Sequence, residues 1–235
     1  VEDLYRPYKQ KRRTRATIAR EKGLEPLAAL AFAYGPALDM EQAALDYIDP
    51  EKGVETAADA LQGASDIIAE LISDDADIRK MLRELYLRRS LLVSKAAAKE
   101  PEDSVYRLYY DFKQPVSRVQ GYQVLAINRG ERENILKVNV ELDPETAHIA
   151  VRRASVPNRA AMDFVRTAAD DAYDRLIQPS MEREIRNTLT DQANEGAIHM
   201  FALNLKPLLM QPPVKGKVTM GLDPGYRMGC KVAVV

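Results

Sequence analysis

The sequence predicts a mainly α-helical protein: a helical scaffold with a helix-turn-helix-like unit, a short β element and a C-terminal β-hairpin. Apolar residues recur at three- and four-residue steps over long stretches, which is typical of helices packed on one face. Strict alternation occurs in one stretch, near residues 135–142. We expect residues 1–50 to form a basic arm and a short-helix unit, 51–213 a central helical domain, and 214–235 the opening of another domain.

The first element is a basic arm. Residues 5–15 carry six cations, two tyrosines and no acid. Lysine and arginine neutralise phosphates and release counterions, and tyrosine stacks on unpaired bases. The arm therefore predicts contacts with RNA or single-stranded DNA through Arg6, Lys9, Lys11, Arg12, Arg13, Arg15, Tyr5 and Tyr8. The alternative is a solvated linker whose arginines pair with acids such as Glu2, Asp3 and Glu21.

Three short helices should follow the arm. Residues 16–22 favour a helix, with Gly23 as its C-terminal cap, and residues 24–33 form the next. Asp39 is placed to cap the third helix, with Gln42 reaching back in a capping box. Short helices with tight breaks favour a helix-turn-helix-like unit.

Two longer helices come next. Apolar residues step along one face from Val54 to Ile72, and the helical period resumes from Ile78 to Leu92. The break at residues 73–75 supplies a new N-cap, so we expect these two helices to pack as an antiparallel hairpin.

The stretch from 104 to 143 is ambiguous. Leu136, Val138, Val140 and Leu142 alternate with polar residues, which predicts a half-exposed strand. Residues 122–129 fit a helix, although 122–127 can also pair as the partner of that strand. We favour a helix followed by a strand.

The last helices cover residues 161–176 and 181–205. The first should stop near Pro179, a residue that suits a first helical turn. The second has an apolar stripe in steps of four, which winds around the helix, so we expect this helix to be central. Pro207, Pro212 and Pro213 close the helical region. Residues 218–222 and 231–235 then flank a turn and predict a β-hairpin.

Composition excludes several classes of protein. Hydrophobic residues make up 46% and charged residues 29%, with a net charge of −1, so any attraction to nucleic acid must come from a local patch. No apolar run is long enough for a membrane span, and no signal peptide is visible. The single cysteine, Cys230, fits a reducing compartment, and we expect a cytoplasmic protein. The missing Met and the final apolar run suggest a piece of a longer protein.

Catalytic residues are not predicted. Asp223 ends a strand, where it can hold metal in an RNase H-type nuclease, but that chemistry needs carboxylates from other strands. The favoured interpretation is that Asp223 starts a turn. His148 and His199 are far apart with no cysteine nearby, and Cys230 lacks catalytic partners. We therefore expect no metal, no cofactor and no small-molecule substrate.

Four segments together resemble the bacterial Tex family of transcription accessory proteins. They are residues 3–15 (DLYRPYKQKRRTR), 124–131 (VLAINRGE), 201–209 (FALNLKPLL) and 221–231 (GLDPGYRMGCK). They occur in the family's order and span nearly the whole chain. The resemblance implies that residues 214–235 open a YqgF domain of RNase H-like fold, followed elsewhere in the family by helix-hairpin-helix and RNA-binding modules.

The resemblance implies a function as well. It suggests a non-enzymatic nucleic-acid-binding factor of transcription, in which this region serves as a helical scaffold. Two rival hypotheses remain. One is a metal-dependent nuclease or resolvase centred on Asp223 in the whole protein, and the other is a scaffold that docks on RNA polymerase or the ribosome.

Overall fold

The computed structural model describes residues 2–5, 8, 12–33, 38–98, 103–156, 162–212, 215–225, 227 and 229–235. Its contacts define two compact units, residues 1–194 and 195–235. The fold is mainly α-helical with small antiparallel sheets, as the sequence predicts. None of the described helices is both long enough and apolar enough to cross a membrane.

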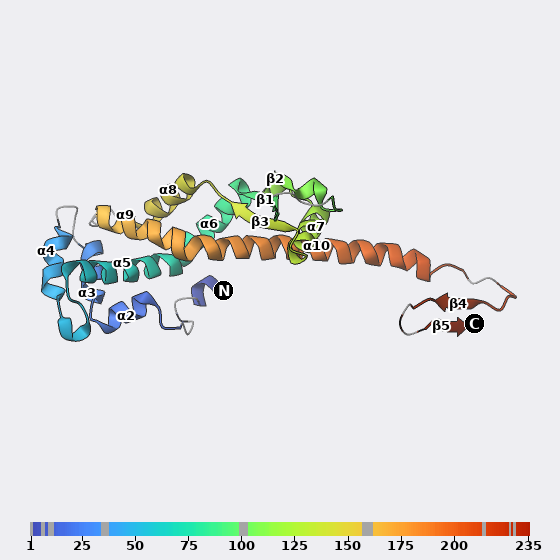
Figure 1. Cartoon of the computed structure of the whole chain (residues 1–235), viewed down its shortest axis with the longest axis horizontal. Coiled ribbons are helices and arrows are strands. Elements are labelled where there is room, and N and C mark those ends of the chain that lie inside the picture. Colours follow the sequence, from blue (N-terminus) through green and yellow to red (C-terminus); the bar gives the residue numbers. More distant parts are fainter. Residues whose placement is uncertain are drawn as a thin grey trace. The chain divides into compact units, whose positions relative to one another are not determined.

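The helical half of the first unit is assembled around one long helix, α5 (Figure 1). α5 packs against α2, α3, α4, α9 (Met162–Asp171) and the π-helical segment η6 (Ala172–Ile177). The bounds of the helices that open the chain are α1 Glu2–Tyr5, α2 Arg15–Glu21, α3 Glu25–Ala33, α4 Met40–Ala44, α5 Ala57–Asp74 and α6 Ala76–Arg89.

Local capping explains where these helices begin and end. Gly23, after α2, has a φ of 84°, a left-handed conformation that favours glycine, in agreement with its predicted role as a cap. Asp39 caps α4 by accepting from the backbone N–H groups of Glu41 and Gln42, as predicted. Capping boxes form elsewhere, between Thr56 and Asp59 at the start of α5 and between Gln120 and Gln123.

The predicted hairpin of two long helices is wrong. A single residue, Asp75, ends α5 and caps α6. One residue is too short a connection to reverse the chain direction, since helical hairpins use loops of about two to five residues. α5 packs chiefly on α2, α9 and η6 instead.

The predicted helix through Leu92 is also corrected. α6 ends at Arg89, and Leu91–Ala96 form β1, the central strand of a three-stranded sheet of order β2-β1-β3. Both neighbours pair antiparallel with β1; they are β2, Asp111–Pro115, and β3, Leu136–Glu141. α7, Gly121–Arg132, precedes β3, so the helix-then-strand prediction for this stretch is confirmed.

Of the remaining helices, α9, η6 and α10 follow one another without a break, and α8 precedes them. Their bounds are α8 Pro144–Ser155, α9 Met162–Asp171, η6 Ala172–Ile177 and α10 Gln178–Leu209. The predicted stop near Pro179 is replaced by a π-helical passage from α9 into α10, with Pro179 in the first turn of α10 as expected. α10 also continues past Pro207, which lies inside its last turn.

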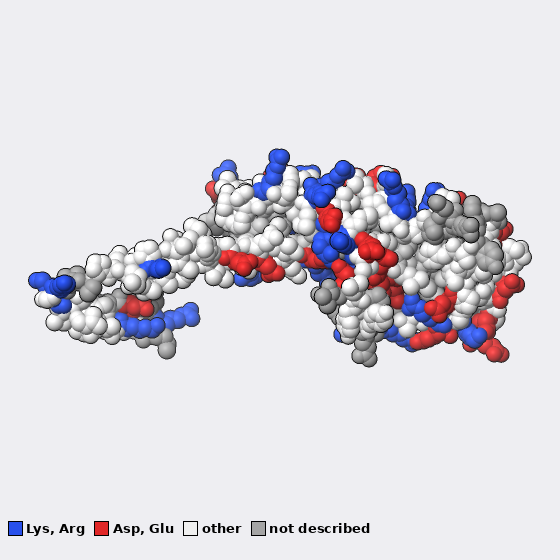
Figure 2. Space-filling model, turned by 180° about the vertical axis from the view of Figure 1, so that it is seen from behind, with Lys and Arg blue, Asp and Glu red and all other residues white. Residues whose placement is uncertain are grey.

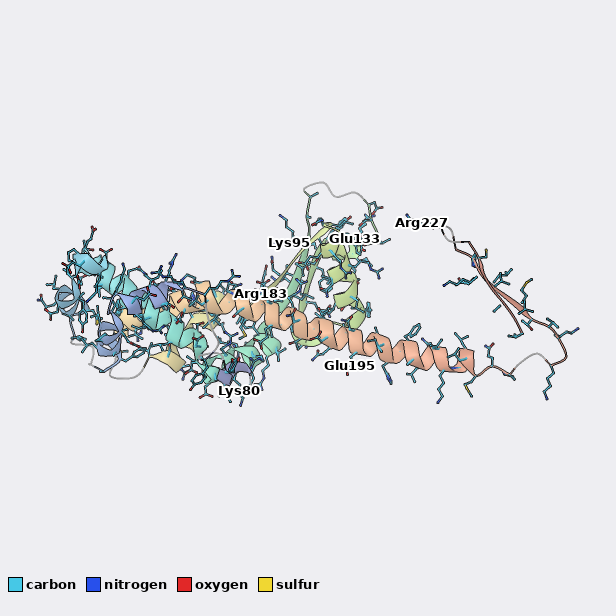
Figure 3. The ribbon with its side chains drawn as sticks, turned by 90° about the horizontal axis from the view of Figure 1, so that it is seen from below. Lys80, Lys95, Glu133, Arg183, Glu195 and Arg227 are labelled. Carbon is cyan, nitrogen blue, oxygen red and sulfur yellow. The ribbon has the colours of Figure 1, made fainter. Side chains whose placement is uncertain are left out.

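The first half of α10 lies against the outer edge of β3 (Figure 3). There Glu182 accepts a hydrogen bond from the Val140 N–H at 2.9 Å, and Arg186 donates to the Val138 carbonyl at 3.3 Å. Side chains thereby satisfy backbone groups of an edge strand. The prediction of a central helix holds for this half only, where Met181, Ile185, Leu189 and Ala193 are buried.

The second unit contains the rest of α10 and the predicted hairpin. β4, Met220–Asp223, pairs antiparallel with β5, Lys231–Val234, which confirms the hairpin. Several apolar side chains of this half of α10 are exposed, with Phe201 at 66%. The predicted apolar stripe therefore continues beyond the helix's buried part.

Candidate nucleic-acid interface

The basic arm enters α2 through a hydrogen-bonded cap. Thr14 has an extended backbone, and its hydroxyl accepts from the Thr17 N–H at 3.0 Å. The same hydroxyl donates to Glu70 Oε2 of α5 at 2.8 Å. One side chain thus both starts α2 and attaches its first turn to the central helix.

Glu70 is a buried carboxylate that meets two donors among the described residues. Its side chain is 12% exposed, and its second oxygen lies 2.8 Å from the Arg20 guanidinium, also on α2. A buried carboxylate is costly unless it is paired and hydrogen-bonded, and here both oxygens are engaged. The pairing fixes α2, from its cap Thr14 onward, against α5.

The other end of the arm is anchored through Asp3 of α1. Its carboxylate lies 2.7 Å from Arg83 and 3.4 Å from Arg79, both on α6. Arg79 is 1% exposed, and both arginines also pair with Glu184 of α10. Burial acts to raise the pKa of Asp3, but the hydrogen bonds and charges of Arg83 and Arg79 outweigh it and hold this pKa below its usual value.

The described cations of the arm face solvent. Arg12 and Arg15 are exposed, and neither has an ion-pair partner among the described residues. Arg13 pairs with Glu21 at 2.8 Å on the exposed surface, as the linker alternative expected for such arginines. Tyr5 and Tyr8 are 60% and 82% exposed. Arg6, Lys9 and Lys11 lie outside the described residues.

Sequence reasoning missed these anchoring contacts. Glu70 and Asp66 lie one turn apart on α5, and both are buried although neither belongs to the apolar stripe that the sequence predicts from Val54 to Ile72. Asp66 pairs at 2.9 Å with Arg175 of η6. The sequence gives no signal for these buried acids, because charged residues off the apolar stripe of a helix are usually exposed to solvent.

The residues considered for catalysis are not brought together. Asp223 is 78% exposed at the end of β4, and its nearest cation is Lys231 at 4.0 Å. His148 lies 2.8 Å from Asp174 and packs edge-on against Tyr173. Over the part of the chain that the structure describes, no three His, Cys, Asp or Glu side chains are placed to share a metal ion.

A cleft of about 750 Å³ opens beside the sheet. At its base the Tyr86 and Tyr173 hydroxyls are 2.8 Å apart. Burial, followed by the hydrogen bond to Tyr173, raises the pKa of the Tyr86 hydroxyl. The cleft is lined by Tyr86, Arg89, Leu91, Lys113, Asn139, Val140, Glu141, Leu142, Asp143, Pro144, Tyr173, Asp174, Gln178 and Glu182.

The fold defines a mainly helical protein with a basic arm before α2, and comparison with known proteins gives the family. The model of the Tex central region-like family matches residues 35–201. The chain is 39% identical over 251 residues to Protein tex of Bordetella pertussis and 45% identical over 238 residues to an uncharacterized protein, YdcI, of Bacillus subtilis. It belongs to the Tex family.

The relatives are longer than this chain. All of the chain aligns with each of them, but it spans about a third of the two bacterial proteins, 32% and 33%. The human S1 RNA-binding domain-containing protein 1 is 33% identical over 252 residues, of which the chain spans 25%. The family resemblance read from the four sequence segments is thereby confirmed.

Proposed function

We propose that this chain is the helical scaffold of a non-catalytic, nucleic-acid-binding transcription accessory factor, and that its basic arm contacts RNA or single-stranded DNA. Relatives named as a transcriptional accessory protein Tex and as an S1 RNA-binding domain protein support the nucleic-acid link. The observation that carries the arm's role is its attachment at both ends, through Asp3 and Thr14, with Arg12 and Arg15 facing solvent.

Fixing the ends of a basic segment favours binding. The arm already loses part of its conformational entropy when the chain folds, so it loses less conformational entropy when it binds a phosphate chain. Arginine donates two parallel hydrogen bonds to a phosphate, and the exposed Tyr5 and Tyr8 supply ring faces on which bases stack. None of these contacts requires a particular base sequence, so the arm should bind without strong sequence preference.

The test is a triple variant, Arg12→Ala, Arg13→Ala and Arg15→Ala, titrated with a labelled oligouridylate over a series of salt concentrations. The slope of the logarithm of the association constant against the logarithm of salt concentration should decrease in magnitude by about 0.7 for each lost phosphate contact. The triple variant should therefore reduce this slope by up to about 2. Arg13 should contribute least, because Glu21 already neutralises it.

A matched control replaces three other exposed cations, Arg118, Arg132 and Lys137, which form no ion pair with a described residue. An equal loss in both triple variants would show that overall charge, and not the arm, controls binding. An unchanged slope in the arm variant would refute the arm's role.

The rival hypotheses make different predictions. A nuclease centred on Asp223 requires Mg²⁺- or Mn²⁺-dependent cleavage by the complete protein that Asp223→Asn abolishes. Docking on RNA polymerase or the ribosome is favoured by the exposed apolar side chains of α10, among them Ile198 and Phe201. Capture of purified polymerase with no affinity for nucleic acid would select that function.

A further inference from the structure

A second group of arginines gathers in the first unit, away from the arm in sequence. Arg88 and Arg89 occupy the last turn of α6, Arg152 and Arg153 the last turn of α8, and Arg166 the middle of α9. In Figure 2 basic side chains follow one another along the upper edge of this unit, where Figure 1 places α8, α6 and the sheet. We call these five residues the arginine patch.

Two hollows join the members of the patch. One, of about 410 Å³, is lined by Arg88 and Arg89 together with Ala150 of α8. The other, of about 420 Å³, is lined by Arg152, Arg153 and Arg166. Ala150 of α8 lines the first hollow, and the preceding residue, Ile149, lines the second. α8 therefore forms a ridge between the two hollows. Arg153 follows both residues by one turn, so it lies on that ridge.

Three of the five arginines are available to a ligand. Arg88, Arg89 and Arg153 are exposed and have no ion pair with a described residue. Arg152 is held by both oxygens of Asp170, at 2.7 and 2.5 Å, and Arg166 lies 3.7 Å from the fully exposed Asp163. Glu84 is the one carboxylate among the described residues that line the two hollows. The patch therefore keeps a positive excess after internal pairing.

The hollows also offer apolar surface. Met81 and Leu85 line the first, and Ile149, Val156 and Met162 line the second. A chain that alternates charged phosphates with the less polar faces of sugars and bases matches such a surface. Guanidinium groups are planar forks that fit phosphate oxygens, and arginine is enriched where phosphates are recognised.

We infer that the arginine patch of α6, α8 and α9 is a second nucleic-acid contact surface, which holds the phosphate backbone across the ridge of α8. The inference rests on the proposed function and adds to it a site that the basic arm does not include. An acidic segment of a partner protein is the competing occupant.

The test uses the whole 235-residue chain and the triple variant Arg88→Ala, Arg89→Ala and Arg153→Ala. A labelled oligouridylate and a DNA duplex are titrated at several salt concentrations. Loss of three phosphate contacts should lower the logarithmic salt slope by about 2 for the single strand. Because Arg88 and Arg89 also favour the C-terminus of α6, a second variant with lysine at the three positions keeps the charge and should restore most of the slope.

The outcomes separate the two proposals. A reduced slope in the alanine patch variant, restored by lysine, supports the patch. Binding equal to wild type in the patch variant, with weakened binding in the variant of Arg12, Arg13 and Arg15, overturns the patch and leaves the arm intact. Failure of the wild-type chain to bind either probe overturns both. An equal reduction of the salt slope in the control variant of Arg118, Arg132 and Lys137 would show that overall charge controls binding, which would overturn the patch. Binding of a polyglutamate peptide in preference to the oligonucleotides would assign the patch to an acidic protein partner.

Discussion

The attachment of α2 to α5 through Glu70 is open to a sharp test, Glu70→Gln. The carboxylate accepts one hydrogen bond from the Thr14 hydroxyl and one from Arg20, each at 2.8 Å. The amide keeps one acceptor and loses the charge. A hydrogen bond to a charged group contributes about 1.5–3 kcal/mol, so we expect the free energy of unfolding to fall by about 2 kcal/mol.

For a chain of this size that loss corresponds to a Tm lower by about 4–8 °C. Urea unfolding followed by circular dichroism measures the change in the free energy of unfolding. The control is Glu41→Gln, at an exposed acid of α4. Adding Thr14→Ala to Glu70→Gln should cost at least about 0.5 kcal/mol less than the sum of the single changes, because both changes act on the same hydrogen bond. If Glu70→Gln is no more destabilising than the control, the anchor does not hold α2.

Three further changes test other parts of the structure. A Cβ at Gly63 would lie 2.3 Å from Leu24 Cδ1 and 3.3 Å from the Ala19 Cβ, so Gly63→Ala should lower the free energy of unfolding by about 1–2 kcal/mol. Gly196→Ala, with nothing within 4 Å, should raise it. Equal effects would contradict the close packing of Ala19 and Leu24 on α5. Tyr86→Phe should cost about 1–2 kcal/mol at neutral pH. Because the folded pKa of Tyr86 is raised, this contribution is present below pH 10 and lost above it, so wild type and variant should converge in alkali; a constant difference would argue against the buried hydroxyl pair. Asp3→Asn should weaken oligonucleotide binding and lower the free energy of unfolding by about 1 kcal/mol. Since the folded pKa of Asp3 is lowered, that stabilisation is present above the usual carboxyl range and lost in acid, and a pH-independent difference would exclude the ion pair.

Local features of the sequence predicted much of the helical fold. The strand Leu136–Glu141 was predictable because apolar and polar residues alternate within the strand itself. The caps at Asp39 and Gly23 were predictable because capping depends on the adjacent backbone. β1 was not predictable in the same way. Its residues continue the apolar period of α6, and its partners, β2 and β3, lie far along the chain. Only the assembled sheet distinguishes this strand from another turn of helix.

In the candidate site, too, local features were predictable from the sequence and long-range contacts were not. The arm's composition predicted its cations and tyrosines, since charge and ring type are properties of single residues. Its anchors could not be predicted, because Thr14 meets Glu70 across 56 positions and Asp3 meets Arg83 across 80. The arginine patch likewise draws on three helices, and none of the three contains a basic run as dense as the arm.

The most direct measurement is the salt dependence of oligouridylate affinity for the wild-type chain. If charge presented by the arm and the patch binds the phosphate backbone, the logarithm of the association constant should fall linearly with the logarithm of salt concentration. Arg12, Arg15 and the three available patch arginines give five phosphate contacts, and Arg13 adds a sixth. Five to six contacts predict a slope of about −4. An affinity that does not change with salt, or no binding at low salt, would contradict the account.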